Sequence, residues 1–235
     1  YNPNDLELPD NFLSQHPFDN GEMYVRDELL ADYPRTDKEI KQHLADYYGM
    51  ISHLDSSIGK ILSALDDTGV SGNTIVVYTA DHGLAVGQHG LLGKQNLYEH
   101  SIKVPFLIRG PQVPVSSQSD AFCYLYDFAS TLCDMLDISI PPSFEGRSFW
   151  NTIINGDIHR HTVFSAYKDK HRSIRDNRYK LIKYYLGDKI TSQMFDLLSD
   201  PLETDNLIDN RKDHPLLSSM ESKMSELQTS FSDPI

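Results

Sequence analysis

The fold is decided by the stretch TIVVYTADHG, which occupies residues 74–83. Its first six residues are apolar or β-branched without alternation, a pattern typical of a strand buried on both faces of a parallel sheet. In open α/β sheets ligands bind beyond the carboxyl ends of the strands, so Asp81 and His82 are expected at a ligand site. Gly83 allows a sharp turn there. The pair predicts half of a divalent metal site, and the alternative is an ordinary turn in which Asp81 caps a helix.

A glycine-rich segment, GQHGLLGKQNLYE, follows at residues 87–99. It carries His89 and Lys94 and leads into a second apolar strand at about 104–108. For Lys94 the alternative to a functional role is a surface position in a mobile loop. For His89 the alternative is a structural histidine that bonds the loop backbone.

Helices are predicted on both sides of these strands. Thr36 and Glu39 form a capping box, which predicts a helix from there to about residue 68. Its apolar positions recur at three- and four-residue steps and should face a sheet: Ile40, Leu44, Tyr47, Ile51, Leu54, Ile58, Ile61 and Leu65. A second helix is predicted at about 122–137. A helix, a short turn and a buried strand are the rhythm of an α/β fold.

Beyond residue 160 the pattern changes to short strands. They are predicted at 162–167, 173–175, 180–185 and 193–196, with turn residues between them, and they indicate an antiparallel meander. A final helix at about 214–229 should pack on it through Leu216, Leu217, Met220, Met224 and Leu227. We therefore divide the chain into residues 1–155, an α/β core, and residues 156–235, an antiparallel α+β subdomain. The charges Arg172, Arg175 and Lys180 are expected on the surface of the meander.

Composition excludes some classes of function. The 235 residues contain 21 Lys and Arg against 34 Asp and Glu, a formal charge of −13. Such an acidic chain is a poor binder of nucleic acid, because phosphate contacts need basic residues. No apolar run of about 18 residues is present, so no membrane span is predicted. An anionic ester remains a possible substrate, since a bound cation and a few lysines set the local field.

The order of these motifs resembles the second half of the type I sulfatases, which belong to the alkaline phosphatase-like superfamily. The resemblance begins with Asp81-His82-Gly83, continues through Gly87–Gly90 and Gly93–Gln95, and reaches Tyr98-Glu99. It then extends over nearly the whole chain, through Val104–Ile108, Tyr126-Asp127, Pro141–Ser148, Arg172–Arg175, Tyr179–Ile182, Phe195–Leu197, Asp200–Glu203 and Asn206-Leu207. Its specificity lies in the order and spacing of several motifs.

The resemblance implies a fold and a set of roles. The expected fold is α/β, an alkaline phosphatase-like mixed or parallel sheet flanked by helices and present in part, plus a small C-terminal antiparallel sheet with a packed helix. Asp81 and His82 are expected as metal ligands, with Ca²⁺ as the first choice and Mg²⁺ or Mn²⁺ as alternatives. Lys94 and His89 are expected as catalytic residues, and Lys94 and Gln95 as substrate-binding residues.

One family motif is absent. Type I sulfatases carry a Cys-x-Pro-Ser-Arg nucleophile, or a variant of it, whose Cys or Ser becomes formylglycine. Neither Cys123 nor Cys133 is followed by that pattern. We therefore expect formylglycine on a missing N-terminal half, which becomes a partner of this chain together with a sulfated small molecule or glycan. Family analogy favours a periplasmic, secreted or lysosomal-type compartment. Two alternatives remain: a phosphate or phosphonate monoester hydrolase of the same superfamily, and a non-catalytic binding domain.

Overall fold

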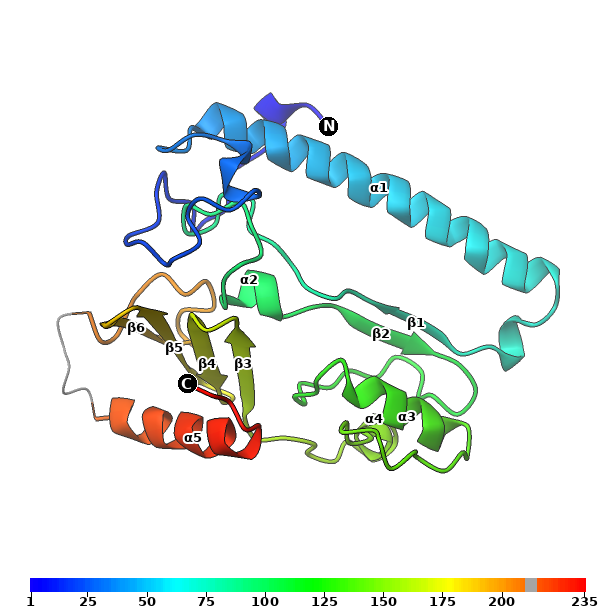
Figure 1. The fold of residues 1–235 in the computed structure, drawn as a ribbon. Helices are drawn as coiled ribbons and strands as arrows, with labels where there is room; N and C mark the ends of the chain where they lie inside the picture. Colours follow the sequence, from blue (N-terminus) through cyan, green and yellow to red (C-terminus); the bar gives the residue numbers. More distant parts are fainter. Residues whose placement is uncertain (210–214) are drawn as a thin grey trace.

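The computed structural model describes residues 1–209 and 215–235. Figure 1 shows the long helix α1 above the β1–β2 ribbon, with the C-terminal sheet and helix α5 gathered to one side. The helices are α1 (Asp37–Asp67), α2 (Glu99–Ile102), α3 (Asp127–Met135), α4 (Trp150–Asn155) and α5 (Leu217–Ser230), with short 3-10 turns η1 (Pro3–Asp5), η2 (Glu28–Leu30) and η3 (Ser71–Asn73). The strands are β1 (Val76–Thr79), β2 (Phe106–Arg109), β3 (Val163–Tyr167), β4 (His171–Arg175), β5 (Tyr179–Leu186) and β6 (Lys189–Asp196).

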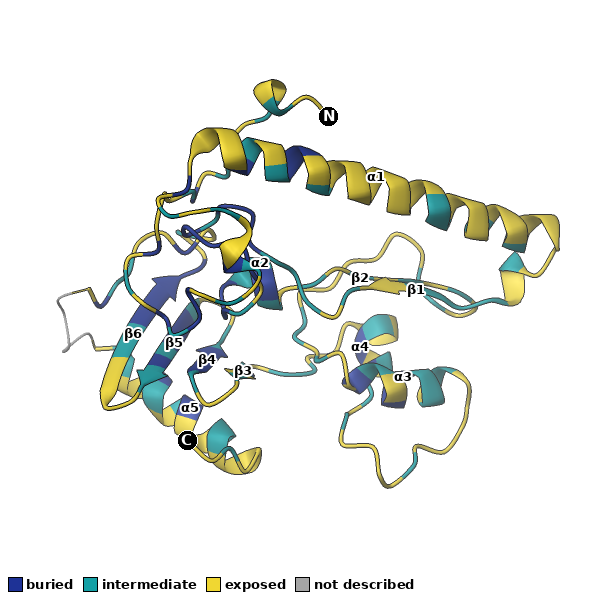
Figure 2. Cartoon of the chain, turned by 45° about the horizontal axis from the view of Figure 1, so that its top comes forward, coloured by how far each residue is buried: buried dark blue, intermediate teal, exposed yellow. Residues whose placement is uncertain are grey.

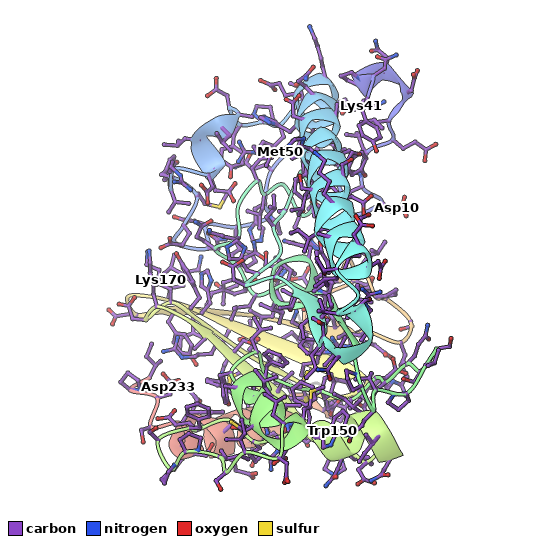
Figure 3. The ribbon with its side chains drawn as sticks, turned by 90° about the vertical axis from the view of Figure 1, so that its right-hand side faces the viewer. Asp10, Lys41, Met50, Trp150, Lys170 and Asp233 are labelled. Carbon is purple, nitrogen blue, oxygen red and sulfur yellow. The ribbon has the colours of Figure 1, made fainter. Side chains whose placement is uncertain are left out.

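Helix α1 begins where the capping residues predict it. The backbone N–H of Glu39 donates to Thr36 Oγ1 at 3.3 Å, which satisfies one of the free donors of the first turn. Only the start of its apolar stripe is buried, however, since Leu54 is 49% and Ile61 is 64% exposed. Figure 2 shows exposed positions along most of α1, and Met50, labelled in Figure 3, is 69% exposed. The prediction that the whole stripe faces a sheet is therefore wrong for the described residues.

Strand β1 differs from the prediction in its pairing direction and in its burial. Strand β1 pairs with β2 in antiparallel register, from Val76 opposite Arg109 to Thr79 opposite Phe106. Neither face is fully covered, since Tyr78 on β1 is 38% exposed. Within the described parts of the chain these two strands form a sheet of their own. The apolar run gives the strand correctly, but burial on both faces of a parallel sheet is not seen here.

Helix α3 is shorter than predicted. It begins at Asp127, whose buried carboxylate accepts the backbone N–H groups of Tyr124 at 2.8 Å and Arg147 at 2.9 Å. The same carboxylate pairs with Arg160 at 2.6 Å. These bonds hold the irregular segment before Asp127, which ends in a turn at residues 125–126, so the helix starts after it. Helix α4 follows and was not predicted.

The C-terminal meander is confirmed. Its four strands lie in the order β3-β4-β5-β6, each antiparallel to the next. Successive side chains of β5 point to opposite faces: Leu181 packs in the cluster that contains Met220 and Met224 of α5, whereas Ile182 packs with Leu91 of the glycine-rich loop. Helix α5 thus covers one face, as predicted, and the loop after β1 covers the other. Position 214, the predicted start of this helix, lies outside the described residues. The domain division after residue 155 stays a prediction.

Candidate active site

The acid and the imidazole lie side by side just after β1. The side chain of Asp81 is 86% exposed and that of His82 is 34% exposed. Their facing atoms, Asp81 Oδ2 and His82 Nε2, are 3.4 Å apart. The backbone N–H of His82 donates to Asp81 Oδ1 at 3.0 Å, which fixes the direction of the carboxylate. Both groups are therefore presented to a ligand at the end of a regular strand.

The hydrogen bonds of this pair fit a cation. His82 Nδ1 lies 2.9 Å from the carbonyl oxygen of Gly83. A carbonyl only accepts, so Nδ1 carries the proton, and in the neutral ring Nε2 presents a lone pair to Asp81 Oδ2. Two acceptors that face each other need a proton or a cation between them. Ligand distances of about 2.3–2.6 Å place two ligands at right angles about 3.3–3.7 Å apart, and metal-bound histidines commonly donate their other N–H to a backbone carbonyl.

The pair supplies only part of a metal's coordination. Across residues 1–209 and 215–235, no three or more His, Cys, Asp or Glu side chains are placed to hold one ion. Asp81 and His82 offer two ligand atoms, whereas Ca²⁺ takes six to eight and Mg²⁺ about six. The remaining ligands would have to come from water, substrate or another polypeptide segment.

Gly83 ties the pair to helix α2, which follows the glycine-rich loop. Its N–H donates to the carbonyl oxygen of Ser101 at 2.9 Å. A Cβ at Gly83 would collide with the carbonyl oxygen of His100, so no larger residue fits there. Two residues later, the N–H of Ala85 donates to the carbonyl oxygen of Gly93 at 2.9 Å. The segments before and after the loop are therefore held together.

Lys94 directly follows Gly93, whose carbonyl oxygen accepts the N–H of Ala85. Since Ala85 is three residues after His82, their Cα atoms are at most roughly 11 Å apart. The chain thus brings Lys94 to the same end of the molecule as the acid–imidazole pair. Its side chain is exposed, and among the described residues no carboxylate lies in ion-pair contact with it. The structure gives no direct contact between Lys94 and Asp81 or His82.

Gln95 is held within the loop at both ends of its amide. Its Oε1 accepts the backbone N–H of Lys94 at 3.0 Å, and its Nε2 donates to Asp27 Oδ2 at 2.9 Å. Hydrogen bonds from Gln95 and then from Arg26 lower the pKa of the Asp27 carboxyl. Both polar atoms of Gln95 are therefore engaged, so its substrate-binding role stays a prediction and this geometry suggests support of the loop.

His89 lies inside the molecule and not beside Lys94. It is 4% exposed, its ring stacks on Tyr98 with centroids 3.9 Å apart, and its Nε2 lies 3.2 Å from Asn11 Nδ2, which donates to it. Burial lowers the pKa of His89 to about 4. The ring is therefore neutral and enclosed near pH 7. Its predicted catalytic role gains no support from this position, which matches the alternative of a structural histidine.

The buried histidines predict a pH-dependent stability. Burial lowers the pKa values of both His16 and His89 from 6.5 to about 4. The unfolded chain then binds more protons between these pH values, so the free energy of unfolding should fall as the pH drops from 6.5 towards 4. Each histidine should contribute about 1.4 kcal/mol per pH unit. The charges of His171 and Asp19 also affect the pKa of His16, and those of Lys180 and Asp200 affect the pKa of His89.

Urea unfolding at pH 7, 5.5 and 4.5 measures this slope. The variant His89→Gln should flatten it, whereas His53→Asn, at an exposed position of α1, should leave it unchanged. The raised pKa of the buried Glu203 carboxyl acts in the opposite sense and offsets part of the effect. Equal stability at pH 7 and 5 would contradict the assignment of buried neutral histidines.

A buried ion cluster joins the end of the loop to the C-terminal sheet, and the sequence analysis missed it. Lys180 is fully buried on β5, with its Nζ 3.0 Å from Glu99 Oε1 and 2.7 Å from Glu203 Oε1. Arg175 of β4 pairs with the other oxygen of Glu99. The expectation of a surface position is wrong for Lys180 and for Arg172, which is 2% exposed and binds Asp233 at 2.6 Å, whereas the Arg175 side chain is 19% exposed. The partners are far apart in sequence, so no local pattern could reveal these pairs.

Comparison with known proteins identifies the class. Residues 11–138 match the model of the Sulfatase family, and residues 87–230 match that of N-sulphoglucosamine sulphohydrolase, C-terminal. These matches place the α/β fold in the alkaline phosphatase-like superfamily. Within it, this chain belongs to the sulfatase family. The recognition and the fold class predicted from sequence are thereby confirmed.

Individual relatives agree with the family. The chain is 33% identical over 208 residues to arylsulfatase K of Xenopus laevis, covering 83% of this chain and 38% of that protein. It is 29% identical over 201 residues to N-acetylglucosamine-6-O-sulfatase of Bacteroides thetaiotaomicron, covering 77% and 36%. A solved structure in complex with its substrate D-glucosamine-2-N,6-O-disulfate superimposes with a TM-score of 0.78 at 27% identity, covering 87% and 44%. The chain thus spans less than half the length of these relatives.

No described helix is long and apolar enough to cross a membrane.

Proposed function

We propose that this chain is the C-terminal half of a sulfatase that hydrolyses sulfate monoesters of carbohydrates. The observation that carries the proposal is the pair Asp81 and His82, whose facing acceptor atoms lie 3.4 Å apart at the end of β1. The net reaction consumes one water and releases an alcohol, a sulfate ion and a proton. The relatives with sulfatase names support this reaction type.

Asp81 and His82 would hold a divalent ion, with Ca²⁺ first and Mg²⁺ or Mn²⁺ as alternatives. The carboxylate favours Ca²⁺, and the imidazole nitrogen keeps the other ions open. Such an ion, when bound, supplies Lewis-acid polarisation of the sulfate oxygens. It would also offset the exposed negative charge of Asp81, which otherwise repels an anionic ester.

Lys94 would bind the sulfate from the loop side. Its ammonium can donate hydrogen bonds, and its backbone belongs to a loop that packs on the C-terminal sheet. Negative charge moves towards the bridging oxygen as the S–O bond breaks, and a cation held nearby stabilises that charge without reorganising. Lys94 can therefore lower the barrier as well as bind the ester.

The N-terminal half would supply formylglycine, which provides the nucleophile, and the remaining metal ligands. Two exposed features support such a partner. The apolar stripe of α1 is uncovered at Leu54 and Ile61, and β1–β2 is an isolated two-stranded ribbon in the described chain. A two-stranded ribbon is marginal by itself. Further strands from the N-terminal half would extend this sheet and fill the space beside α1.

The proposed substrate is a sulfated glycan that contains glucosamine. The N-acetylglucosamine-6-O-sulfatase and the complex with a disulfated glucosamine are the relatives that favour it. A periplasmic, secreted or lysosomal-type compartment is proposed by analogy with enzymes that meet such glycans.

The test compares this chain alone with the full-length protein. We expect no hydrolysis of an aryl sulfate or a 6-O-sulfated glucosamine by the chain alone, because its described residues bring together only two candidate metal ligands and its sequence lacks the formylglycine motif. The full-length protein should hydrolyse both sulfate esters and should act more slowly on the matching phosphate and phosphonate esters. Clear turnover by the chain alone would contradict the division of the site, and a preference for phosphonate would contradict the sulfatase assignment.

A further inference from the structure

A buried carboxylate contacts the backbone of the lysine loop, the part of the glycine-rich segment at residues 91–95 that carries Lys94. Glu28, on the 3-10 turn η2, is 3% exposed. Its Oε2 accepts the backbone N–H of Leu92 at 3.0 Å and its Oε1 accepts that of Gly93 at 3.0 Å. These are the two residues that precede Lys94. Figure 1 shows the N-terminal segment running beside the loop that follows β1.

The charge of Glu28 is compensated within the same segment. Arg35 Nη2 donates to Glu28 Oε2 at 2.6 Å, and both side chains are almost completely buried. Tyr33 donates its hydroxyl to the same oxygen at 3.1 Å. Arg35 also donates to the carbonyl oxygens of Glu28, at 2.8 Å, and of Ala31. The carboxylate and the guanidinium are therefore rigid, because nearly every polar atom has a partner.

Gln95, the residue after Lys94, is held by Asp27, the residue before Glu28. Gln95 Nε2 donates to Asp27 Oδ2 at 2.9 Å, and Gln95 Oε1 accepts the Lys94 N–H at 3.0 Å. Gly93 lacks a side chain at the point of closest approach, where a Cβ would lie 3.0 Å from Glu28 Oε1 and collide with Gln95 Oε1. Glu28 thus binds the backbone just before Lys94, and Asp27 holds the Gln95 side chain that accepts the Lys94 N–H.

This arrangement is a costly way to stabilise a loop. A buried ion pair must overcome the desolvation of both charges, and apolar residues of similar size often stabilise a fold as well or better. A buried carboxylate that accepts two backbone N–H groups does something that apolar residues cannot. It fixes the direction of those two N–H groups and therefore the course of the backbone. The Lys94 side chain is exposed. Among the described residues it interacts with Asp27, whose pKa is lowered by the hydrogen bond from Gln95 and, to a lesser extent, by the charge of Lys94. Its position therefore depends mainly on the backbone that carries it.

We propose that Asp27 and Glu28, the latter neutralised by Arg35, are positioning residues that set the place of the Lys94 ammonium in the sulfate site. The inference rests on the proposed function of Lys94. A displacement of about 1 Å in a catalytic group can lower the rate by about 100-fold, so fixing residues 93 and 95 is sufficient to matter.

The test is a double-mutant cycle in the full-length enzyme. Glu28→Gln should lower kcat/KM for a sulfate ester by roughly 10- to 100-fold, mainly through kcat, because the lysine is misplaced in the transition state. In a Lys94→Ala background the same substitution should cost less than about threefold, because the group it positions is gone. Hydrogen exchange gives a second readout: the amides of Leu92 and Gly93 should exchange faster in Glu28→Gln.

A matched control is available at Glu22. This carboxylate is also 3% exposed and pairs with Lys168 at 3.0 Å and Lys170 at 2.5 Å, at the β3–β4 connection. Glu22→Gln should destabilise the protein comparably but change kcat/KM less than about twofold per folded molecule. If Glu28→Gln does not fold, Asp27→Ala replaces it, since Asp27 lies nearer the surface and its loss frees Gln95 and the exposed Arg26.

The outcomes separate the two levels of inference. If Glu28→Gln or Asp27→Ala lowers activity equally with and without Lys94, the positioning role is overturned. Unchanged exchange at Leu92 and Gly93 in Glu28→Gln overturns it as well. If Lys94→Ala alone has no effect on turnover, the proposed function of Lys94 fails first. Coupling of both substitutions to Lys94, with faster exchange of the two amides, supports the proposal.

Discussion

Replacing Lys94 by alanine should lower kcat/KM of the full-length enzyme for sulfate esters by about 10²–10³-fold. Lys94 is the lysine of the glycine-rich loop, and its side chain is exposed. Without it, charge on the sulfate oxygens and the leaving oxygen loses a fixed donor. Lys94→Arg keeps the positive charge but delocalises it over the planar guanidinium group, so this variant should retain part of the activity. Steady-state kinetics on one aryl sulfate measures both variants.

This effect should be separable from stability. The Lys94 side chain is exposed, and such surface substitutions usually change the free energy of unfolding by no more than about 0.5 kcal/mol. Lys103, exposed at the end of α2, is the matched control, and Lys103→Ala should retain kcat/KM within about twofold. A Lys94→Ala enzyme that stays within threefold of wild type would remove the loop from the catalytic site.

Local patterns predicted the elements whose causes are local. The hydroxyl of Thr36 caps α1 within three residues, and the turn at Gly187, with φ of 58°, separates β5 from β6. The end of an apolar strand marked Asp81 and His82 as a ligand pair, and the two side chains do face each other. In each case the information lies within a few consecutive residues.

The features that were missed depend on residues far apart in the chain. Lys180 reads as a surface charge on a strand, and it is buried because Glu99, 81 positions earlier, lies opposite it. Glu28 supports the lysine loop across 64 and 65 positions to Leu92 and Gly93. His89 shows the same limit, because a histidine between Gln88 and Gly90 is compatible with either a reactive or a structural role, and only the structure shows its ring stacked on Tyr98.

The exposure of β1 and of the α1 stripe has a different cause. An apolar run indicates that a strand packs against an apolar surface. That surface need not belong to the residues that the structure describes. Tyr78, Leu54 and Ile61 are exposed by 38%, 49% and 64%. Their apolar pattern is that of buried elements, which agrees with a chain that covers 38% of a homologous sulfatase. The pattern is therefore typical of elements that are buried in a larger protein, as we propose for this chain.

Asp81→Asn should abolish tight metal binding by the full-length enzyme and with it the sulfatase activity. The carboxylate supplies the charge of the pair, and its neutral amide leaves His82 Nε2 without an anionic partner at 3.4 Å. We expect metal affinity to fall by at least about 100-fold, in the range seen for altered metal-site residues. Metal content after dialysis and activity titrated with Ca²⁺, Mg²⁺ and Mn²⁺ provide the measurements.

The metal titration also tests which ion the site prefers. Wild-type enzyme treated with a chelator should lose activity and regain it with Ca²⁺ at the lowest concentration, because an exposed carboxylate is a hard oxygen ligand. Asp55→Asn, at an exposed position of α1, should keep its metal and its activity. His82→Ala should retain weak metal binding through Asp81, so excess ion should restore part of its activity, whereas Asp81→Asn should recover less. If Asp81→Asn retained as much metal as wild type, the acid–imidazole pair would not be a ligand pair, and the lone pairs that face each other across 3.4 Å would have to be joined by a proton.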